Sequence, residues 1–138
     1  MSGGLERIAE SSARLHGHRR VVAFQDVDAA GIVFYARVFD YFHDAYVDFL
    51  RARGAPLEAA LQDGAWVAPL TRAEAEYLRP LRFGDAVDVV IAAVELEDTE
   101  YTVEYRAEVD GEVVAVGRTR HVSVDPETFR RSAVPEVL

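Results

Sequence analysis

Two carboxylates, Asp26 and Asp28, lie where an apolar, strand-like run gives way to a long amphipathic pattern. They belong to the segment FQDVDAAGIVFY, residues 24–35. A helix that begins after this segment would place its free backbone N–H groups, and the positive end of its dipole, beside the carboxylates. A nucleophile or general base next to an oxyanion site is the arrangement that acyl transfer requires. The segment therefore places a carboxylate where acyl transfer could take place.

The same residues have structural interpretations. An Asp before a helix often serves as an N-cap or Asx-turn residue, so capping is the alternative role for Asp28. We interpret Asp26 as a turn-shaping carboxylate. If both residues lie in a strand, their side chains point to one face, and one carboxylate could raise the pKa of the other. Gly31 allows either a tight turn or a close approach of backbone to substrate.

One helix and five strands are predicted to position this segment. Residues 18–26 form the first strand, and residues 38–53 form a helix that stops at Gly54. Apolar residues recur at steps of three and four along this helix: Phe39, Phe42, Tyr46, Phe49 and Leu50. Four β-rich runs follow, at residues 66–78, 86–96, 101–109 and 113–124. Asp110-Gly111 predicts a tight hairpin between the last two runs.

This order of elements predicts an α+β fold, in which one long helix packs on an antiparallel sheet of about five strands. Such a sheet leaves edge strands exposed, and pairing between subunits would cover them. We therefore expect a homo-oligomer. Residues 1–16 are predicted to be a flexible segment or a short helix without a function, and residues 17–138 to form the domain.

The motif D-x-D-x-x-G-x-V-x-Y, followed by a long helix, resembles the hotdog-fold thioesterases of the 4-hydroxybenzoyl-CoA thioesterase type. The resemblance covers about residues 18–124. It implies a central helix wrapped by a curved sheet, and a dimer or a dimer of dimers. It also implies that Asp28 is catalytic, that Gly31 is the turn glycine, and that the backbone N–H of Tyr35 binds the thioester oxygen. Some relatives carry an assisting histidine where this chain has Tyr35, so that mechanism is excluded at this position.

The resemblance implies hydrolysis of an acyl-CoA thioester. HDAY, residues 43–46, is similar to a segment of 1,4-dihydroxy-2-naphthoyl-CoA hydrolases, which favours an aryl acyl group. A short-chain aliphatic acyl-CoA, a carrier-protein thioester, and a non-catalytic acyl-CoA-binding module are the alternatives. No cofactor is expected, since coenzyme A is part of the substrate.

Several residues are candidates for substrate binding, each with a structural alternative. Trp66 and Pro69 fall in the region that lines the acyl pocket of the neighbouring subunit in the family, although Trp66 could equally be core. His43 and Tyr46 lie three apart on one helix face, where His43 could also be a partly buried helix residue. Arginine suits phosphate oxygens, and the candidates for phosphate contacts are Arg79, Arg82, Arg118, Arg120 and His121. Each could instead be a solvated charge.

The composition of the chain excludes some kinds of chemistry and partner. The 138 residues include no cysteine, which excludes thiol catalysis. The net charge of −9 makes nucleic acid an unsuitable partner. The histidines form no metal-ligand spacing. Residues 95–100, ELEDTE, form an acidic turn that would repel coenzyme A phosphates. The chain contains no membrane-span pattern or secretory signal, so we expect a cytoplasmic protein.

Overall fold

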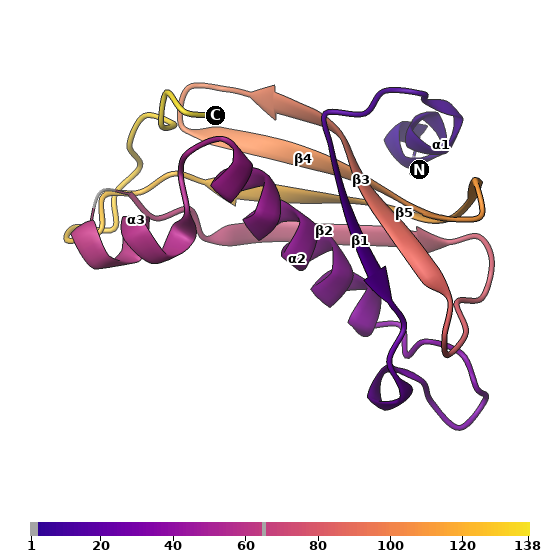
Figure 1. The fold of residues 1–138 in the computed structure, drawn as a ribbon. Helices are drawn as coiled ribbons and strands as arrows, with labels where there is room; N and C mark the ends of the chain where they lie inside the picture. The colour runs from indigo at the N-terminus through magenta and orange to yellow at the C-terminus, as the bar shows by residue number, and fades with distance from the viewer. Residues whose placement is uncertain (1–2, 65) are drawn as a thin grey trace.

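The computed structural model describes residues 3–64 and 66–138. Figure 1 shows one long helix lying across a sheet, with a short N-terminal helix on the other side of the sheet. The elements in chain order are α1 (Gly3–Glu10), β1 (His16–Val21), the 3₁₀ turn η1 (Phe24–Asp26), α2 (Arg37–Ala52), α3 (Leu57–Asp63), β2 (Leu70–Tyr77), β3 (Ala86–Leu96), β4 (Glu100–Val109) and β5 (Glu112–Val122).

The five strands form one antiparallel sheet in the order β1-β3-β4-β5-β2. The predicted α+β class, with a helix on a five-stranded sheet, is therefore confirmed. The hairpin at Asp110-Gly111 is also confirmed, because both residues have the positive φ angles, 51° and 81°, that a tight primed turn needs. β1 and β2 are the two edge strands of the sheet.

Two predicted strands are too long. β1 ends at Val21, and residues 24–26 form η1 instead, because the Asp26 carboxylate accepts a hydrogen bond from the backbone N–H of Ala23 and closes a turn. β2 starts at Leu70 rather than residue 66. Pro69 lacks the N–H that a strand ladder uses, and Val67 makes only an isolated bridge to Val124.

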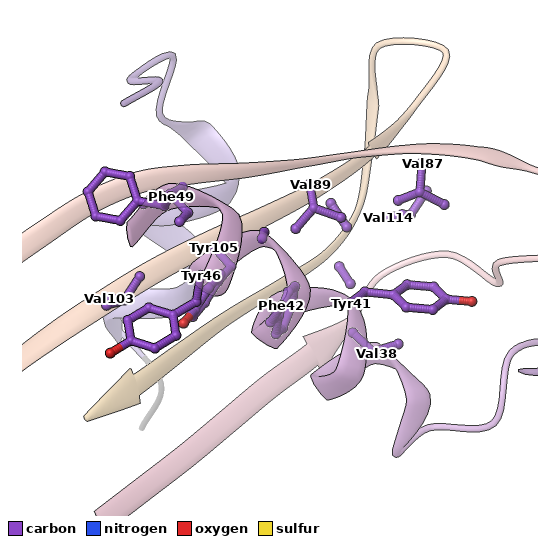
Figure 2. Close-up of a cluster of buried hydrophobic side chains, with 14 of the residues drawn as sticks. Val38, Tyr41, Phe42, Tyr46, Phe49, Val87, Val89, Val103, Tyr105 and Val114 are labelled. Carbon is purple, nitrogen blue, oxygen red and sulfur yellow. The ribbon is translucent and has the colours of Figure 1, made fainter. Parts of the chain in front are cut away.

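The main core lies between α2 and the sheet. Figure 2 shows Phe42 and Tyr46 of α2 beside Tyr105 of the sheet, whereas the ring of Tyr41 points away from them. Phe42 stacks on Tyr105 with ring centroids 4.8 Å apart. A Cβ at Gly117 would lie 2.3 Å from the Phe42 ring, so this glycine permits the close approach of α2 to β5. The predicted apolar stripe of the helix is confirmed.

The other face of the sheet is covered by α1. Leu5 and Ile8 are 2% and 0% exposed against this face. Below them, the buried Glu104 accepts hydrogen bonds from Arg7 and Arg118 at 2.7 and 3.2 Å. Of the two alternatives for residues 1–16, the short helix is found. The predicted domain boundary at residue 17 stays a prediction.

Candidate active site

The motif forms a loop between η1 and α2. Backbone hydrogen bonds close it, from Asp28 N–H to the Ile32 carbonyl and from Gly31 N–H to the Asp28 carbonyl, both 2.9 Å. Gly31 has a φ of 81°, a value that glycine adopts at no steric cost. Gly31 therefore shapes the turn that carries Asp28, as predicted from its residue type. Val33 N–H anchors the loop to the Leu81 carbonyl at 2.8 Å.

The two carboxylates of the motif lie in opposite environments. Asp26 is 6% exposed, whereas Asp28 is exposed. The condition for a shared face, that both residues lie in a strand, is not met, because the segment is a 3₁₀ turn followed by a loop. The Oδ1 atom of Asp28 accepts a hydrogen bond from Ala30 N–H at 2.8 Å, which is an Asx turn. Within the described residues, its Oδ2 atom has no partner and remains available to a substrate or water.

Asp26 has a structural role. It accepts hydrogen bonds from the Tyr41 hydroxyl at 2.8 Å and the Ala23 N–H at 3.4 Å. Arg20 and Arg37 lie 3.5 and 3.9 Å from its carboxylate oxygens. Burial, followed by the hydrogen bond to Asp26, raises the pKa of Tyr41, so this hydroxyl stays a donor. The Asp26 carbonyl also accepts from Phe34 N–H at 2.9 Å. Asp26 thus joins both ends of the motif loop to α2, which agrees with our interpretation of it as a turn-shaping carboxylate.

The start of α2 supplies free backbone donors. The N-cap is Ala36, which offers no side-chain cap. Among the residues that the structure describes, the Tyr35 N–H has no partner. The Tyr35 carbonyl accepts a hydrogen bond from the Tyr77 hydroxyl at 2.9 Å, which fixes this peptide against the end of β2. An uncapped helix N-terminus with a fixed peptide suits a developing negative charge.

Asp28 and Tyr35 line one cavity of about 380 Å³, which we call the motif cavity. Its remaining wall comes from the start of α2 and from the end of β2 with the segment after it: Ile32, Val33, Phe34, Val38, Tyr77, Leu78, Arg79, Pro80, Leu81 and Ala115. The structure therefore brings together the two residues proposed for chemistry. Arg79, one of the candidate phosphate contacts, lines the same cavity, although its guanidinium also pairs with Glu112 at 3.1 Å.

A second cavity of about 300 Å³ lies further along α2, and we call it the aromatic cavity. It contains three of the predicted substrate-binding residues, Trp66, His43 and Tyr46. The other lining residues are Phe39, Leu57, Ala68, Leu70, Ala73, Tyr105, Thr119 and His121. Among the residues that the structure describes, none lines both cavities. Tyr46 lies 11 residues beyond Tyr35, which corresponds to about 16 Å along a helix axis.

The other predicted binding residues, Pro69, Arg82 and Arg120, line neither of these two cavities. Pro69 lies next to the aromatic cavity without lining it, and its carbonyl accepts from Val122 N–H at 3.0 Å. Arg82 is exposed beside the motif loop, where it bridges to Ile32. Arg120 is exposed near the C-terminal end of β5 and pairs with Glu100 at 3.3 Å.

Arg118 and His121, two further candidates for phosphate contacts, are unsuitable for that role in the structure. Arg118 pairs with Glu74 and Glu104 on the sheet face that α1 covers. His121 is 5% exposed, and burial lowers its pKa to about 4, so it carries no charge to attract a phosphate at neutral pH.

The acidic turn is partly neutralised. Glu100 pairs with Arg120 at 3.3 Å and with Arg131 at 3.5 Å. The predicted repulsion of phosphates is therefore weaker than the sequence suggests, because the guanidinium groups of Arg120 and Arg131 lie beside the turn.

Sequence reasoning did not single out the hydroxyl residues of the aromatic cavity, Tyr105 and Thr119. The available signal was strand alternation: residues 101, 103 and 105 of β4 share the face that packs on α2. Thr119 and His121 lie two apart on β5 and both line the cavity.

The described part of the chain contains neither a metal-binding cluster nor a membrane-spanning helix. No cluster of three or more histidines or carboxylates there could hold a metal ion. No helix there is long and apolar enough to cross a membrane.

The amino-acid sequence matches the Thioesterase-like superfamily over residues 22–138. The 1,4-dihydroxy-2-naphthoyl-CoA hydrolase of Rippkaea orientalis is 32% identical over 127 residues, which cover 90% of this chain and 92% of the relative. The enzyme of the same name from Synechococcus elongatus is 34% identical over 121 residues, covering 87% and 89% of the two chains.

The fold is similar to that of solved thioesterases. The structure of a gentisyl-coenzyme A thioesterase superposes with a TM-score of 0.81 at 27% identity, covering 88% of this chain and 97% of that chain. With a match that spans most of the chain and relatives above 30% identity, this chain belongs to the thioesterase-like superfamily, and it is a thioester hydrolase with the hotdog fold.

Proposed function

We propose that the protein hydrolyses an aryl-CoA thioester to the free carboxylic acid and coenzyme A, with Asp28 as the reactive carboxylate. The observation that carries this proposal is the motif cavity, where an exposed carboxylate and an unpartnered helix N-terminus line the same wall. Relatives of this chain are named for hydroxylated aryl-CoA substrates, which supports the aryl class.

The chemistry needs few groups. Asp28 attacks the thioester carbonyl carbon, or removes a proton from a water that does so. The electron pair of the carbonyl moves to oxygen, where the Tyr35 N–H donates a hydrogen bond to the oxyanion. The C–S bond then breaks, and the sulfur leaves as a thiolate that takes up a proton. In the nucleophilic route, water hydrolyses the resulting anhydride and regenerates Asp28.

The aromatic cavity suits the acyl group. Its wall contains the rings of Phe39, Tyr46 and Trp66, and a flat ring buries much area against such surfaces. The two cavities have separate walls: Val38 lines the motif cavity, and Phe39, about 100° further around α2, lines the aromatic cavity. We therefore propose that the complete site is shared between two copies of this chain.

The edge strand β2 offers the route to a shared site. β2 begins at the aromatic cavity, with Leu70 and Ala73 in its wall, and ends at the motif cavity with Tyr77. If the free edges of two β2 strands pair antiparallel about a two-fold axis, the start of one strand lies beside the end of the other. The aromatic cavity of one copy then adjoins the motif cavity of its partner. Exposed apolar side chains along this edge, including Leu70 and Leu78, favour such an interface.

A thiol-release assay tests the reaction. We expect turnover of benzoyl-CoA and hydroxybenzoyl-CoA esters to exceed that of acetyl- and butyryl-CoA by at least about tenfold in kcat/KM. Faster turnover of the short alkyl esters would replace the aryl class by the aliphatic one. Equal turnover of matched pantetheine esters would show that the nucleotide contributes little and would favour a carrier-protein thioester.

Subunit complementation tests the shared site. Asp28→Asn removes the carboxylate, and Ala68→Phe fills the aromatic cavity. In a purified heterodimer of the two variants, one site carries both changes and the other carries none. We expect about half of the wild-type kcat, although each homodimer is nearly inactive. A heterodimer as inactive as its parents would place the whole site within one chain.

A further inference from the structure

The edge strand β2 carries a charge pattern that can complement itself. Side chains of a strand alternate between the two faces of the sheet. Arg72 and Glu74 lie on the face that α1 covers, opposite Arg120 and Arg118 of the neighbouring strand β5. Ala73 lies on the face toward α2, where it lines the aromatic cavity. A second copy that pairs with this edge therefore meets charges on one face and a small side chain on the other.

Both charged side chains can reach a partner strand. The side chain of Arg72 is 70% exposed, and its guanidinium lies 3.6 Å from the Glu74 carboxylate of the same chain. A contact of this length between accessible groups contributes little stability. Arg118 donates to the Glu74 carboxylate at 3.1 Å, which orients it on the sheet. Arg72 can therefore exchange its contact within the chain for one with a carboxylate of a second copy.

The backbone of β2 also presents hydrogen-bonding groups at its free edge. The Leu78 N–H donates to the Val114 carbonyl of β5 at 2.8 Å. Because backbone groups alternate in direction along a strand, the even-numbered residues from 72 to 78 turn theirs toward β5. Ala73, Ala75 and Tyr77 then turn their N–H and C=O groups away from β5. These groups form a ladder edge to which another strand can pair.

Charge distinguishes the possible registers of such a pair. When two identical strands pair antiparallel about a two-fold axis perpendicular to the sheet, one residue lies opposite its own copy. An axis at residue 72 or 74 places two arginines or two glutamates in contact, and an axis at residue 75 places Glu74 opposite Glu76. Like charges directly opposite each other destabilise a strand pair. An axis at Ala73 avoids these contacts and places Arg72 opposite Glu74 twice.

We infer that two copies of this chain pair through β2 with Ala73 on the two-fold axis, so that Arg72 of each copy contacts Glu74 of the other. This inference rests on the proposed shared site and adds the register and the residues that select the partner. The partner is a second copy, because the charge pattern of β2 complements itself. The small side chain of Ala73 allows the two strands to meet at the axis without a clash.

The register matters for the site because it aligns the two kinds of cavity. Leu70, which lines the aromatic cavity, precedes Ala73 by three residues, and Tyr77, which lines the motif cavity, follows it by four. Leu70 of one copy therefore comes close to Tyr77 of the other. Moving the axis by one residue would slide one strand by two residues, or about 7 Å, relative to the other. The Arg72–Glu74 contacts thus fix how the cavities of the two copies meet.

A cysteine scan measures the register directly, because the chain contains no cysteine of its own. At the axial residue, the Cα atoms of the two copies lie about 5 Å apart, which a disulfide can span. One residue from the axis, they lie about 8 Å apart, which is too far. Under mild oxidation, we expect Ala73→Cys to form a disulfide-linked dimer. Arg72→Cys, Glu74→Cys and Ala75→Cys should each form at least about tenfold less of it on a non-reducing gel.

Charge reversal tests the contact independently. In a homodimer, Arg72→Glu or Glu74→Arg creates two like-charge contacts, so the dissociation constant of the dimer should rise at least about tenfold for either variant alone. A mixture of the two variants restores both opposite-charge contacts and should form heterodimers. The double variant Arg72→Glu/Glu74→Arg should dimerise as wild type does. Analytical ultracentrifugation measures association. Arg19→Glu, an exposed position on the other edge strand β1, is the matched control and should leave the constant unchanged.

The outcomes separate the register from the shared site. Efficient cross-linking at residue 72, 74 or 75 in place of residue 73 would overturn the register and leave pairing through β2 intact. If no position cross-links and both single charge variants dimerise as wild type does, β2 is not the interface, and the proposed shared site fails with the inference. Thiol release from aryl-CoA esters reports hydrolysis separately in either case. Should Ala73→Cys not fold, the charge variants decide alone: a mixture that associates no better than its components would overturn the inference.

Discussion

The motif cavity at the start of α2 and the aromatic cavity beside its middle are of comparable size, but their polar groups are organised in opposite ways. Before the helix, Asp28 and Tyr35 are exposed, and the Asp28 Oδ2 atom and the Tyr35 N–H lack partners among the described residues. Further along the helix, Tyr46, Tyr105, Thr119 and His121 of the aromatic cavity are buried, and their side chains take part in hydrogen bonds within the fold. Groups that form new bonds with a reacting carbonyl must be free, whereas groups that select a ligand benefit from fixed positions.

A second contrast lies within the motif itself. Asp26 and Asp28 are two residues apart, yet one supports the loop and the other faces the cavity. The buried network around Asp26 holds the loop in place, which leaves Asp28 free of structural bonds on one oxygen. Each of the following predictions separates the supporting groups from the reacting ones.

The largest effect is expected from Asp28→Asn. This substitution is nearly isosteric and removes the only reactive carboxylate of the proposed mechanism, so kcat should fall by at least about a thousandfold. The free energy of unfolding should change by less than about 0.5 kcal/mol, because the residue is exposed. Thiol release and urea unfolding measure the two quantities. A fully active variant would remove Asp28 from the mechanism.

Asp26→Asn should show the reverse pattern. It leaves Arg20 and Arg37 beside a neutral group in a buried site, and breaking a buried ion pair costs about 3 kcal/mol. We expect a comparable loss in the free energy of unfolding, together with a smaller loss of kcat than in Asp28→Asn. Tyr41→Phe, which removes one hydrogen bond to Asp26, should lower stability by only about 1 kcal/mol. Equal losses of kcat for the Asp26 and Asp28 variants would contradict the division of roles.

The aromatic cavity should make stability depend on pH. The pKa of His121 is about 4 in the folded protein and 6.5 in an exposed chain. Below pH 6.5, the unfolded state binds a proton that the folded state refuses, so the free energy of unfolding falls as the pH decreases to about 4. The loss from this residue should be on the order of 2–3 kcal/mol between pH 7 and pH 4.5.

His121→Phe provides the comparison, because phenylalanine can stack on the same tyrosines but does not titrate. Urea unfolding at the two pH values should show a smaller loss for this variant than for wild type. Asp48, whose pKa is lowered by its hydrogen bond to His16, adds a loss only at more acidic pH. The same pH dependence in wild type and variant would show that His121 is not held neutral by the fold.

The sequence predicted the residues of the motif cavity better than those of the aromatic cavity. The motif is local: Asp28, Gly31 and Tyr35 lie within eight residues, so turn chemistry and helix-end rules describe it. The wall of the aromatic cavity combines α2, the segment before β2, β4 and β5, which meet only through the strand order β5-β2 and β4-β5. No short-range pattern indicates that Tyr105 and Thr119 share a hydrogen bond.

The motif also misled in one respect, and for a physical reason. Alternation in a strand would have placed Asp26 beside Asp28. The carboxylate of Asp26 instead bonds to the backbone of Ala23 and to Tyr41, which turns the chain into η1. Side-chain bonds to nearby backbone compete with strand pairing, and their outcome depends on a partner 15 residues away in α2.

The smallest effect is expected at Tyr35, and it distinguishes backbone from side chain at the reacting end. Tyr35→Phe keeps the N–H and the carbonyl that Tyr77 holds, and the phenol is 64% exposed. The change in kcat/KM should therefore be less than tenfold, which is under about 1.4 kcal/mol of transition-state stabilisation. Tyr35→Pro removes the N–H itself, and proline is tolerated near helix starts. If the backbone donor stabilises the oxyanion, Tyr35→Pro should lower kcat by about a hundredfold or more, with urea unfolding as the check on the fold. A thousandfold loss in Tyr35→Phe with an intact fold would instead make the hydroxyl a participant, and the reacting end of α2 would then depend on a side chain of the helix start and not on its backbone.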